Sequence, residues 1–185
     1  VGQGDSIFIQ LPNGETMLID AGINREGNTV ADYVTRLGIH TIDYLIGTHP
    51  DADHIGGLHH VIDAFDIVNM YLPDYLTTTQ TFERLLDAAL EKELAINFVI
   101  PGVEGIEIIN EQVAEQDLII RFVAPIREGY SNNNNHSIVM HLTYGNTSYL
   151  FTGDAESQAE QDMLDAGIDL KADVLKVGHH GSTSS

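Results

Sequence analysis

Alternating apolar and polar residues at the start of the chain predict a β-hairpin. Two runs rich in β-forming side chains, residues 5–11 (DSIFIQL) and 16–19 (TMLI), flank an Asn-Gly dipeptide, which favours the positive φ angles of a tight turn. A second pair of such runs, residues 138–144 and 148–152, brackets a Gly-Asn dipeptide. The sequence therefore predicts two antiparallel hairpins, one early and one late in the chain.

Apolar residues three or four positions apart predict helices between and after the hairpins. These helices are expected over 28–38, from within 49–57 to about residue 65, over 79–94, and from 157 to 167. Asn28 is the expected N-cap of the first helix, and Ser157 with Glu160 forms a capping box for the last. Tyr33 and Leu90 are expected to face the core.

Short β-rich runs alternate with these helices. They are expected at 44–48, 67–72, 95–100, 106–109, 118–124 and 173–177. Because βα units are mixed with antiparallel hairpins, this order fits two β-sheets with helices on their outer sides. The sequence has no internal repeat of fixed period, and SNNNN at 131–135 is its one low-complexity patch.

The composition sets the size of this fold. At 185 residues, of which 43% are hydrophobic, the chain fits one globular domain over residues 1–185, since domains cluster near ~100–150 residues. No apolar run approaches the ~20 residues that cross a bilayer. The chain starts at Val1 without Met and stops in polar GSTSS, so we expect it to be a piece of a longer protein.

Charge and cysteine content restrict the chemistry. The chain has no cysteine, which excludes disulfides, thiolate metal sites and cysteine nucleophiles. Its 28 acidic residues against 8 basic ones give a formal net charge of −20 and argue against a broad basic surface for nucleic acid. A bound metal ion reverses that sign locally. Solubility alone is the other explanation of the acidity.

Acidic and imidazole side chains gather where four predicted strands end. The largest group lies in THPDADHIGG (48–57), and the others follow TMLI, YLFTG and VLKVG. If these strands lie side by side, their ends converge on one rim of the scaffold. Neutral imidazole and carboxylate suit two zinc or manganese ions, with Asp154 as the bridge between them. The predicted nitrogen and oxygen ligands are His49, Asp51, Asp53, His54, Asp154 and His179.

Other interpretations of the loop at 48–57 stay open. A short Asp-rich stretch also occurs as a solvated turn, and Asp53 is able to cap a following helix. A calcium loop fits less well, because position twelve from Asp51 is Ile62 and not Glu. The other histidines are expected to be surface or half-buried side chains, namely His40, His59, His60 and His141.

Four segments together resemble the metallo-β-lactamase fold: VGQGDSIFIQLPNGETMLIDAG, THPDADHIGG, YLFTGDAE and VLKVGHHGS. They are most similar to the soluble domain of the competence protein ComEC and its stand-alone relatives, in order and over nearly the whole chain. The resemblance implies an α/β fold, an αββα sandwich of two mixed β-sheets flanked by helices, without its C-terminal part. Family members carry metals at one edge of the paired sheets, and many are hydrolases.

The resemblance also implies a role for each matching residue. Asp20 would support the metal loop, and Asp154 would be shared by two divalent ions. The ligands of the individual ions would be His49 and Asp51 for the first, and Asp53, His54 and His179 for the second.

This chain departs from the family pattern at two ligands. Asp51 stands where the commonest form of the loop has His, which makes the first site richer in oxygen and leaves the metal identity open. A His ordinarily precedes the hairpin before TGD, and here Asn132 to Asn135 come first and His136 follows as the candidate ligand. The strand, helix and His-containing loop that usually follow HHGS are missing from this sequence.

Hydrolysis of phosphodiesters is the activity that this resemblance implies. Divalent cations activate water as a nucleophile at neutral pH and stabilise charge on the attacked phosphorus. Asp53 is expected to bind metal and to orient the nucleophile, and His180 or His136 to contact the substrate. Because the Asp-rich loop resembles the phosphoesterase branch, we expect a phosphodiesterase or nuclease linked to DNA uptake.

Two alternatives remain. A small phosphodiester or a phosphorylcholine ester is a substrate that suits the acidity of the chain better than a long nucleic acid. A non-catalytic, metal-stabilised binding or gating domain of a DNA-uptake channel would keep the same ligands. A ComEC-like parent would place the domain outside the cytoplasm and beside the membrane.

Overall fold

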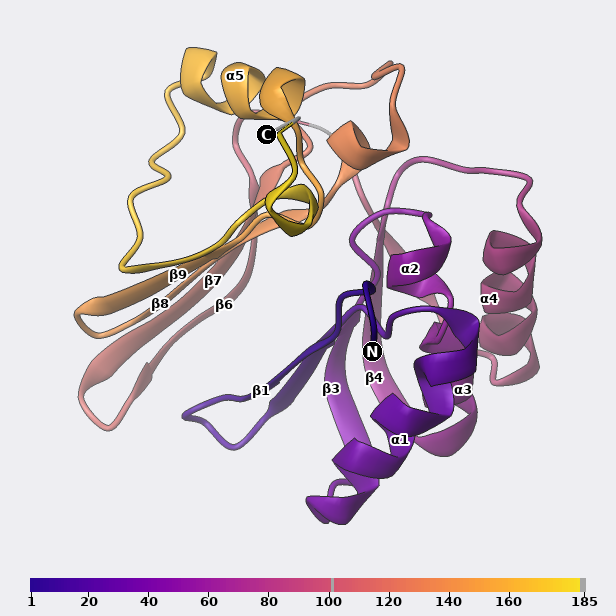
Figure 1. Ribbon diagram of the computed structural model, residues 1–185. Helices are drawn as coiled ribbons and strands as arrows, with labels where there is room; N and C mark the ends of the chain where they lie inside the picture. The colour runs from indigo at the N-terminus through magenta and orange to yellow at the C-terminus, as the bar shows by residue number, and fades with distance from the viewer. Residues whose placement is uncertain (101, 184–185) are drawn as a thin grey trace. The chain divides into compact units, whose positions relative to one another are not determined.

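The chain divides into two compact units, Val1–Phe98 and Val99–Ser185, in a computed structural model that describes residues 1–100 and 102–183 (Figure 1). Each unit contains one mixed β-sheet, and each is described by itself below. The end of the GSTSS segment lies outside the described residues. No helix among the described residues is both long and apolar enough to cross a membrane.

The first unit is built on a five-stranded sheet in the order β1-β2-β3-β4-β5. The predicted hairpin is confirmed, since β1 and β2 are antiparallel, whereas β2-β3 and β3-β4 are parallel. Parallel neighbours end at the same edge of a sheet, which brings the residues after β2 and after β3 together. The strands are β1 (Ile7–Gln10), β2 (Thr16–Ile19), β3 (Thr41–Ile46), β4 (Asp66–Pro73) and β5 (Ile96–Val99).

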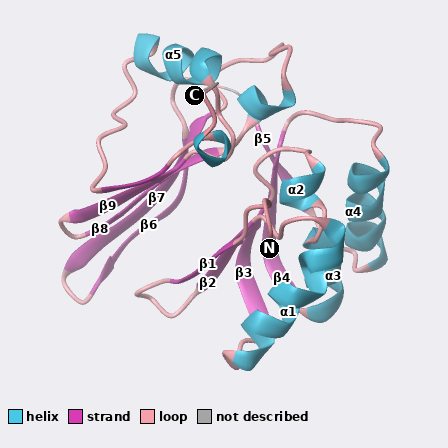
Figure 2. Ribbon diagram, viewed as in Figure 1, coloured by secondary structure: helices cyan, strands magenta, loops and turns pink. Residues whose placement is uncertain are grey.

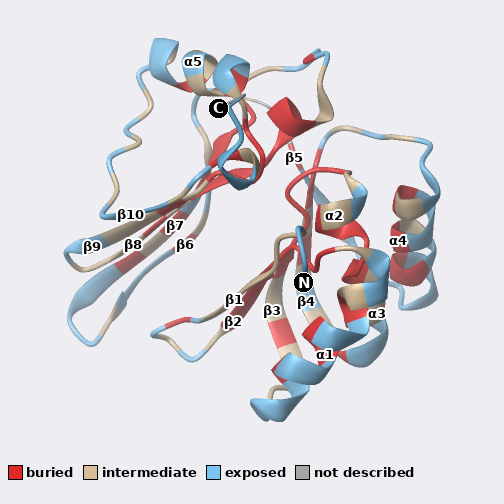
Figure 3. Cartoon of the chain, in the orientation of Figure 1, coloured by how far each residue is buried: buried red, intermediate tan, exposed pale blue. Residues whose placement is uncertain are grey.

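Helices cover one face of this sheet, as Figure 2 shows. The inward side chains of the helices pack on strand residues such as Leu18, Leu45 and Met70 and form a hydrophobic core with them. Figure 3 shows the buried parts of these helices and strands. Two predicted core residues are wrong: Tyr33 is 53% exposed and Leu90 is 77% exposed. The helical elements are η1 (Asn24–Glu26), α1 (Gly27–Arg36), α2 (Ala52–Ile55), α3 (Leu58–Ala64) and α4 (Gln80–Glu91).

The second unit is built on a five-stranded sheet in the order β10-β9-β8-β7-β6. The second predicted hairpin is confirmed by the antiparallel pairing of β8 with β9, and β9 pairs in parallel with β10. Here too, the residues after two parallel strands meet at one edge. The strands are β6 (Ile106–Val113), β7 (Gln116–Ala124), β8 (Val139–Tyr144), β9 (Thr147–Phe151) and β10 (Val174–Lys176).

One α-helix, α5 (Ser157–Asp165), packs on this second sheet through Ala159 and Met163. The predicted capping box is wrong, because Ser157 is the first helical residue and the N-cap residue is Glu156. Asn28 is likewise not a cap, since α1 begins at Gly27 after the short helix η1. Two 3-10 helices complete the unit, η2 (Asn133–His136) and η3 (His179–Gly181).

Candidate functional site

The Asp-rich loop follows β3 in the first unit and is fixed by backbone hydrogen bonds to the segment after β2. The Ala21 amide donates to the His54 carbonyl at 2.9 Å, and the Gly57 amide donates to the Gly22 carbonyl at 2.9 Å. A Cβ on Gly57 would collide with the Ala21 carbonyl oxygen and lie 2.8 Å from the Gly27 Cα. Glycine is therefore required there, because only a bare Cα lets the two backbone segments approach this closely.

Asp20 is the centre of a buried polar network in this unit. Its carboxylate accepts from the Thr48 amide at 2.8 Å, from the Thr48 hydroxyl at 2.7 Å and from His54 Nδ1 at 2.8 Å. Asp20 adopts a φ of 57°, a left-handed conformation that Asp tolerates better than most residues. The predicted supporting residue thus lies against the loop, held there by its own strand end.

This network fixes the tautomers of two buried imidazoles, His49 and His54. Because a carboxylate only accepts, His54 Nδ1 carries the proton of the bond to Asp20. The Thr48 hydroxyl gives its proton to Asp20, so it accepts from His49 Nδ1 at 3.1 Å. Both neutral rings then carry their lone pair on Nε2, the atom that binds a metal ion. Thr48 was not among the predicted site residues, yet its hydroxyl bonds to both Asp20 and His49.

The two acids of the loop differ in position. Asp51 immediately precedes α2, and its carboxylate lies 3.8 Å from His49 Nε2. Asp53 is the second residue of α2, so the interpretation of Asp53 as an N-cap is wrong. Asp51 is the N-cap residue of α2, but its side chain makes no capping bond.

Asp5 is a further acid of this unit that the sequence reasoning did not assign. Its amide donates to the Asp53 carbonyl at 3.1 Å, and its carbonyl accepts from the Gly22 amide at 2.8 Å. One carboxylate oxygen of Asp5 lies within 4.8 Å of a ring nitrogen of His54. The signal in the sequence is its place at the end of VGQGD, a run that leads directly into β1.

In the second unit, Asp154 lies beside one of the two adjacent histidines. Its carboxylate is 3.3 Å from His180 Nε2 and 3.5 Å from Lys176 Nζ, and its amide donates to the Ser137 hydroxyl at 3.0 Å. His179 points elsewhere, with Nδ1 3.1 Å from a Glu156 oxygen. Within this unit, His180 and not His179 is therefore the neighbour of Asp154.

His136 is buried in η2, where its Nε2 donates to the Tyr130 carbonyl at 3.2 Å. Its ring meets the Tyr130 ring edge-on, with 5.3 Å between centroids. Burial lowers the pKa of His136 below its usual value. Its role as a ligand stays a prediction.

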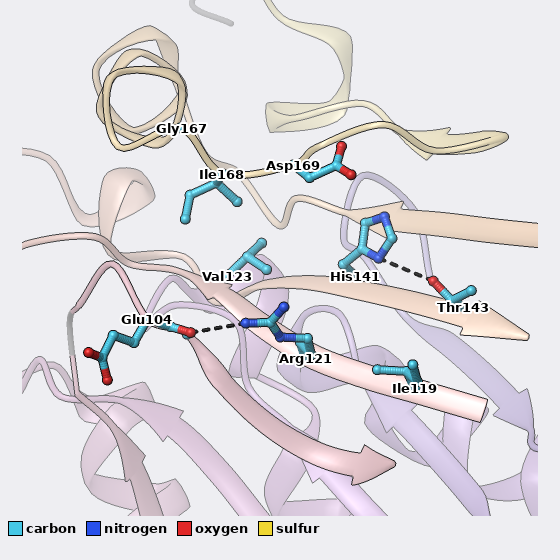
Figure 4. Close-up of a pocket in the computed structure, with 10 residues that line it drawn as sticks. Glu104, Ile119, Arg121, Val123, His141, Thr143, Gly167, Ile168 and Asp169 are labelled. Atoms are coloured by element: carbon cyan, nitrogen blue, oxygen red, sulfur yellow. Dashed lines mark hydrogen bonds between the residues drawn. The ribbon is translucent and has the colours of Figure 1, made fainter. Parts of the chain in front are cut away.

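A groove of about 380 Å³ on the second sheet contains none of the predicted site residues (Figure 4). Arg121 and His141 are opposite each other on β7 and β8 and form its floor. His141 is half-buried, as expected, and donates from Nε2 to the Lys171 carbonyl at 2.9 Å. The groove mixes acidic and basic side chains and points to no particular ligand.

The donors in each unit fit a divalent cation such as zinc or manganese. They are nitrogen and oxygen atoms, and two of the imidazoles are oriented by an oxygen partner on Nδ1, which is the usual support of a metal-binding histidine. That the groups of the two units serve the same ions stays a prediction. So do the number of ions and the individual ligand assignments.

The relatives of this chain among known proteins include "Competence protein ComA" of Neisseria gonorrhoeae, which is 24% identical over 189 residues that cover all of this chain and 23% of that protein. The sequence is 31% identical over 202 residues to "ComE operon protein 3" of Bacillus subtilis and 30% identical over 190 residues to "Recombination protein 2" of Haemophilus influenzae. All of this chain is covered in both matches, but only 25% and 21% of those proteins. The chain therefore spans a quarter or less of the length of these relatives.

Solved structures share the fold at low sequence identity. "Rm3 metallo-beta-lactamase" superposes with a TM-score of 0.53 at 13% identity, covering 92% of this chain and 70% of its own. A mutant of the "CmlA beta-hydroxylase" superposes with a TM-score of 0.54 at 14% identity, covering 92% of this chain and 32% of its own. The two mixed sheets flanked by helices confirm the predicted fold class. The metallo-beta-lactamase superfamily matches the sequence over residues 1–185, and the chain belongs to that superfamily.

Proposed function

We propose that this chain is a metal-dependent phosphodiesterase or nuclease domain that acts in DNA uptake. Superfamily membership supports a hydrolase in general, and relatives named as a competence protein and a recombination protein support a DNA substrate. The proposed cofactors are two zinc or manganese ions. The proposed ligands are those of the sequence analysis, namely His49, Asp51, Asp53, His54, His136, Asp154 and His179, with Asp20 in support.

The observation that carries this proposal is the hydrogen-bond network of Thr48. Its hydroxyl donates to Asp20 and accepts from His49, while Asp20 also accepts from His54. One buried Asp-Thr pair thus sets both imidazoles to the tautomer with Nε2 as the lone-pair nitrogen. A purely structural role would not need two adjacent buried rings in the same metal-binding form.

The remaining residues have roles that follow from their positions. Bound divalent cations would supply an activated water and would neutralise negative charge on the phosphate. Asp53 would orient the nucleophile from the first turn of α2. His180 would donate a hydrogen bond to the substrate or its leaving group, and it already lies beside the Asp154 carboxylate at 3.3 Å.

Hydrolysis of bis-p-nitrophenyl phosphate tests the proposal. We expect activity that depends on added Mn²⁺ or Zn²⁺ and falls by at least ~100-fold in Asp154→Ala, because a ligand carboxylate is lost while the fold is kept. Asp165→Ala is the matched control, since Asp165 is an exposed acid at the end of α5. Circular dichroism and urea unfolding verify that both variants are folded.

A different result would favour the non-catalytic alternative. If elemental analysis finds full metal occupancy, yet phosphodiester, single-stranded DNA and lactam substrates all stay intact, the chain is a metal-stabilised binding or gating domain. If Asp154→Ala hydrolyses the ester as fast as the control does, the assignment of Asp154 is wrong.

A further inference from the structure

The asparagine run at 131–135 is not a featureless linker, because it holds the side chain of Glu156. The side-chain amide of Asn132 donates to Glu156 Oε2 at 2.8 Å, and that of Asn134 donates to Glu156 Oε1 at 2.8 Å. Asn134 is buried and Asn132 is half-buried. Both carboxylate oxygens therefore have a short bond to a side-chain amide, one from the N-cap of η2 and one from within η2.

A third asparagine fixes the backbone of Glu156. The side-chain oxygen of Asn135 accepts from the Glu156 amide at 3.1 Å and from the Ala159 amide at 3.2 Å. This is the helix-capping role that the sequence pattern had assigned to Ser157, and it comes from a residue far upstream. Glu156 is consequently held by both its main chain and its side chain.

The carboxylate held in this way meets His179. The distance from Glu156 Oε1 to His179 Nδ1 is 3.1 Å, and the side chains are 16% and 32% exposed. An ionised carboxylate has no proton to give, so Nδ1 of His179 is the donor and Nε2 of the neutral ring carries the lone pair. His179 has a φ of 42° and His180 a φ of 52°, both left-handed, which turns the adjacent rings to different carboxylates.

We propose that Glu156 is a positioning residue that holds His179 in the Nδ1-protonated form, so that Nε2 carries the lone pair that would bind a divalent cation. The inference rests on the proposed metal-dependent function and adds to it a residue that supports the second unit's histidine. The three asparagines act through Glu156, because they restrict its rotation before any cation binds. An oxygen partner on the second ring nitrogen raises the basicity of a ligand histidine and fixes its orientation.

A structural role alone would make a different prediction. If Glu156 only helped to anchor η2 to α5, the tautomer of His179 would follow its intrinsic preference, and loss of the carboxylate would change stability alone. The proposal instead ties the charge of Glu156 to the protonation site of a ring in another element, η3.

The tautomer of His179 in the metal-free protein provides the direct test. Long-range ¹⁵N–¹H correlation of the imidazole nitrogens, with His179→Gln to assign its signals, should show the proton on Nδ1 in the wild type. Glu156→Gln should shift the population toward the form protonated on Nε2. Glu160→Gln, a half-buried acid on the same helix, is the matched control and should leave the signals unchanged.

Metal affinity is the second readout. Titration with Mn²⁺ and with Zn²⁺ should give a dissociation constant that is about 10–100-fold weaker in Glu156→Gln at unchanged stoichiometry. Asn134→Ala should weaken binding less, since it loosens the carboxylate without removing its charge. If Glu156→Gln does not fold, the tautomer of His179 in the wild type and the metal titration of Asn134→Ala still test the positioning role of Glu156.

The two possible failures are distinguishable. A wild-type His179 that carries its proton on Nε2, or an affinity that does not change in Glu156→Gln, overturns the positioning role and leaves metal-dependent hydrolysis standing. A wild type with the expected tautomer that binds neither metal supports the positioning of His179 and overturns the proposed function.

Discussion

The two units of this protein use the same local design with different supports. In the first unit, the hairpin β1-β2 is followed by α1, by the parallel strand β3 and then by His49. In the second, the hairpin β8-β9 is followed by α5, by the parallel strand β10 and then by His179. Each parallel pair places an acid and a histidine at the same edge of its sheet.

The similarity extends to the opposite ends of the paired strands. Asp43 accepts from the amide of Thr16 at 2.8 Å and from its hydroxyl at 3.0 Å. Asp173 accepts from the amide of Ser148 at 2.8 Å and from its hydroxyl at 3.0 Å. The same side chain thus ties together the starts of two parallel strands in both units.

The two units differ in how a carboxylate holds a histidine, which is His54 in the first unit and His179 in the second. Asp20 and His54 are buried, with 1% and 0% of their side chains exposed, and the acid belongs to a strand end. Glu156 and His179 are partly exposed, and the acid is held by asparagine side chains. The first support is part of the folding core, whereas the second is attached to a loop and can change with little effect on the core.

The largest expected effect is that of Asp20→Ala on stability. Its removal leaves two Thr48 donors and His54 Nδ1 buried without their acceptor, so the free energy of unfolding should fall by about 3–5 kcal/mol in urea titrations. Glu156→Ala should cost about 1 kcal/mol, because water reaches two of the groups it leaves, the half-buried Asn132 and the partly exposed His179.

Asp32→Ala, an exposed acid on α1, is the control and should lie close to the wild type. Equal losses in Asp20→Ala and Glu156→Ala would remove the distinction between a core support and a loop support.

The next largest effect is that of replacing a glycine, which a protein can need either for lack of space or for a positive φ angle. Gly57→Ala should lower the free energy of unfolding by about 1–3 kcal/mol, because its Cβ has no room between two backbone segments. Gly167, the residue after the C-cap of α5, has open space but a φ of 71°. Gly167→Asn should therefore be nearly neutral, since Asn tolerates the left-handed region.

Chemical unfolding of the two glycine variants measures the difference between their free energies of unfolding. A Gly57→Ala protein as stable as Gly167→Asn would mean that the loop after β3 is not packed as tightly as described.

Local patterns predicted most of the fold, and contacts distant in sequence explain what they missed. Both hairpins follow from turn dipeptides between β-rich runs, and each signal is complete within residues 5–19 or 138–152. The helix predicted through 49–65 is instead split into α2 and α3 at Gly56-Gly57. The cause is the packing of Gly57 on Ala21, which no local pattern contains.

The same limit applies to the candidate site. Asp20 and the histidines were predictable as residue types at strand ends, and the family resemblance implied that Asp20 supports the metal loop. The role of Thr48 in setting the tautomer of His49 was not predictable, because it depends on two simultaneous hydrogen bonds of the Thr48 hydroxyl. The capping of α5 by Asn135 was hidden for a similar reason, since the local Ser157 and Glu160 pattern suggested another cap.

The smallest effect concerns Asp173, the exposed counterpart of Asp43. Hydrogen bonds from the Ser148 amide and hydroxyl lower the pKa of Asp173 below its usual value. A carboxylate with a lowered pKa in the folded state stabilises the protein above its unfolded pKa of about 4, and this contribution disappears as the pH falls through the folded value. Thermal unfolding of the wild type should therefore lose slightly more stability between about pH 5 and pH 3 than that of Asp173→Asn, which cannot titrate. Identical pH profiles would show that this bond contributes nothing in solution, and the resemblance between the two units would then be one of geometry alone.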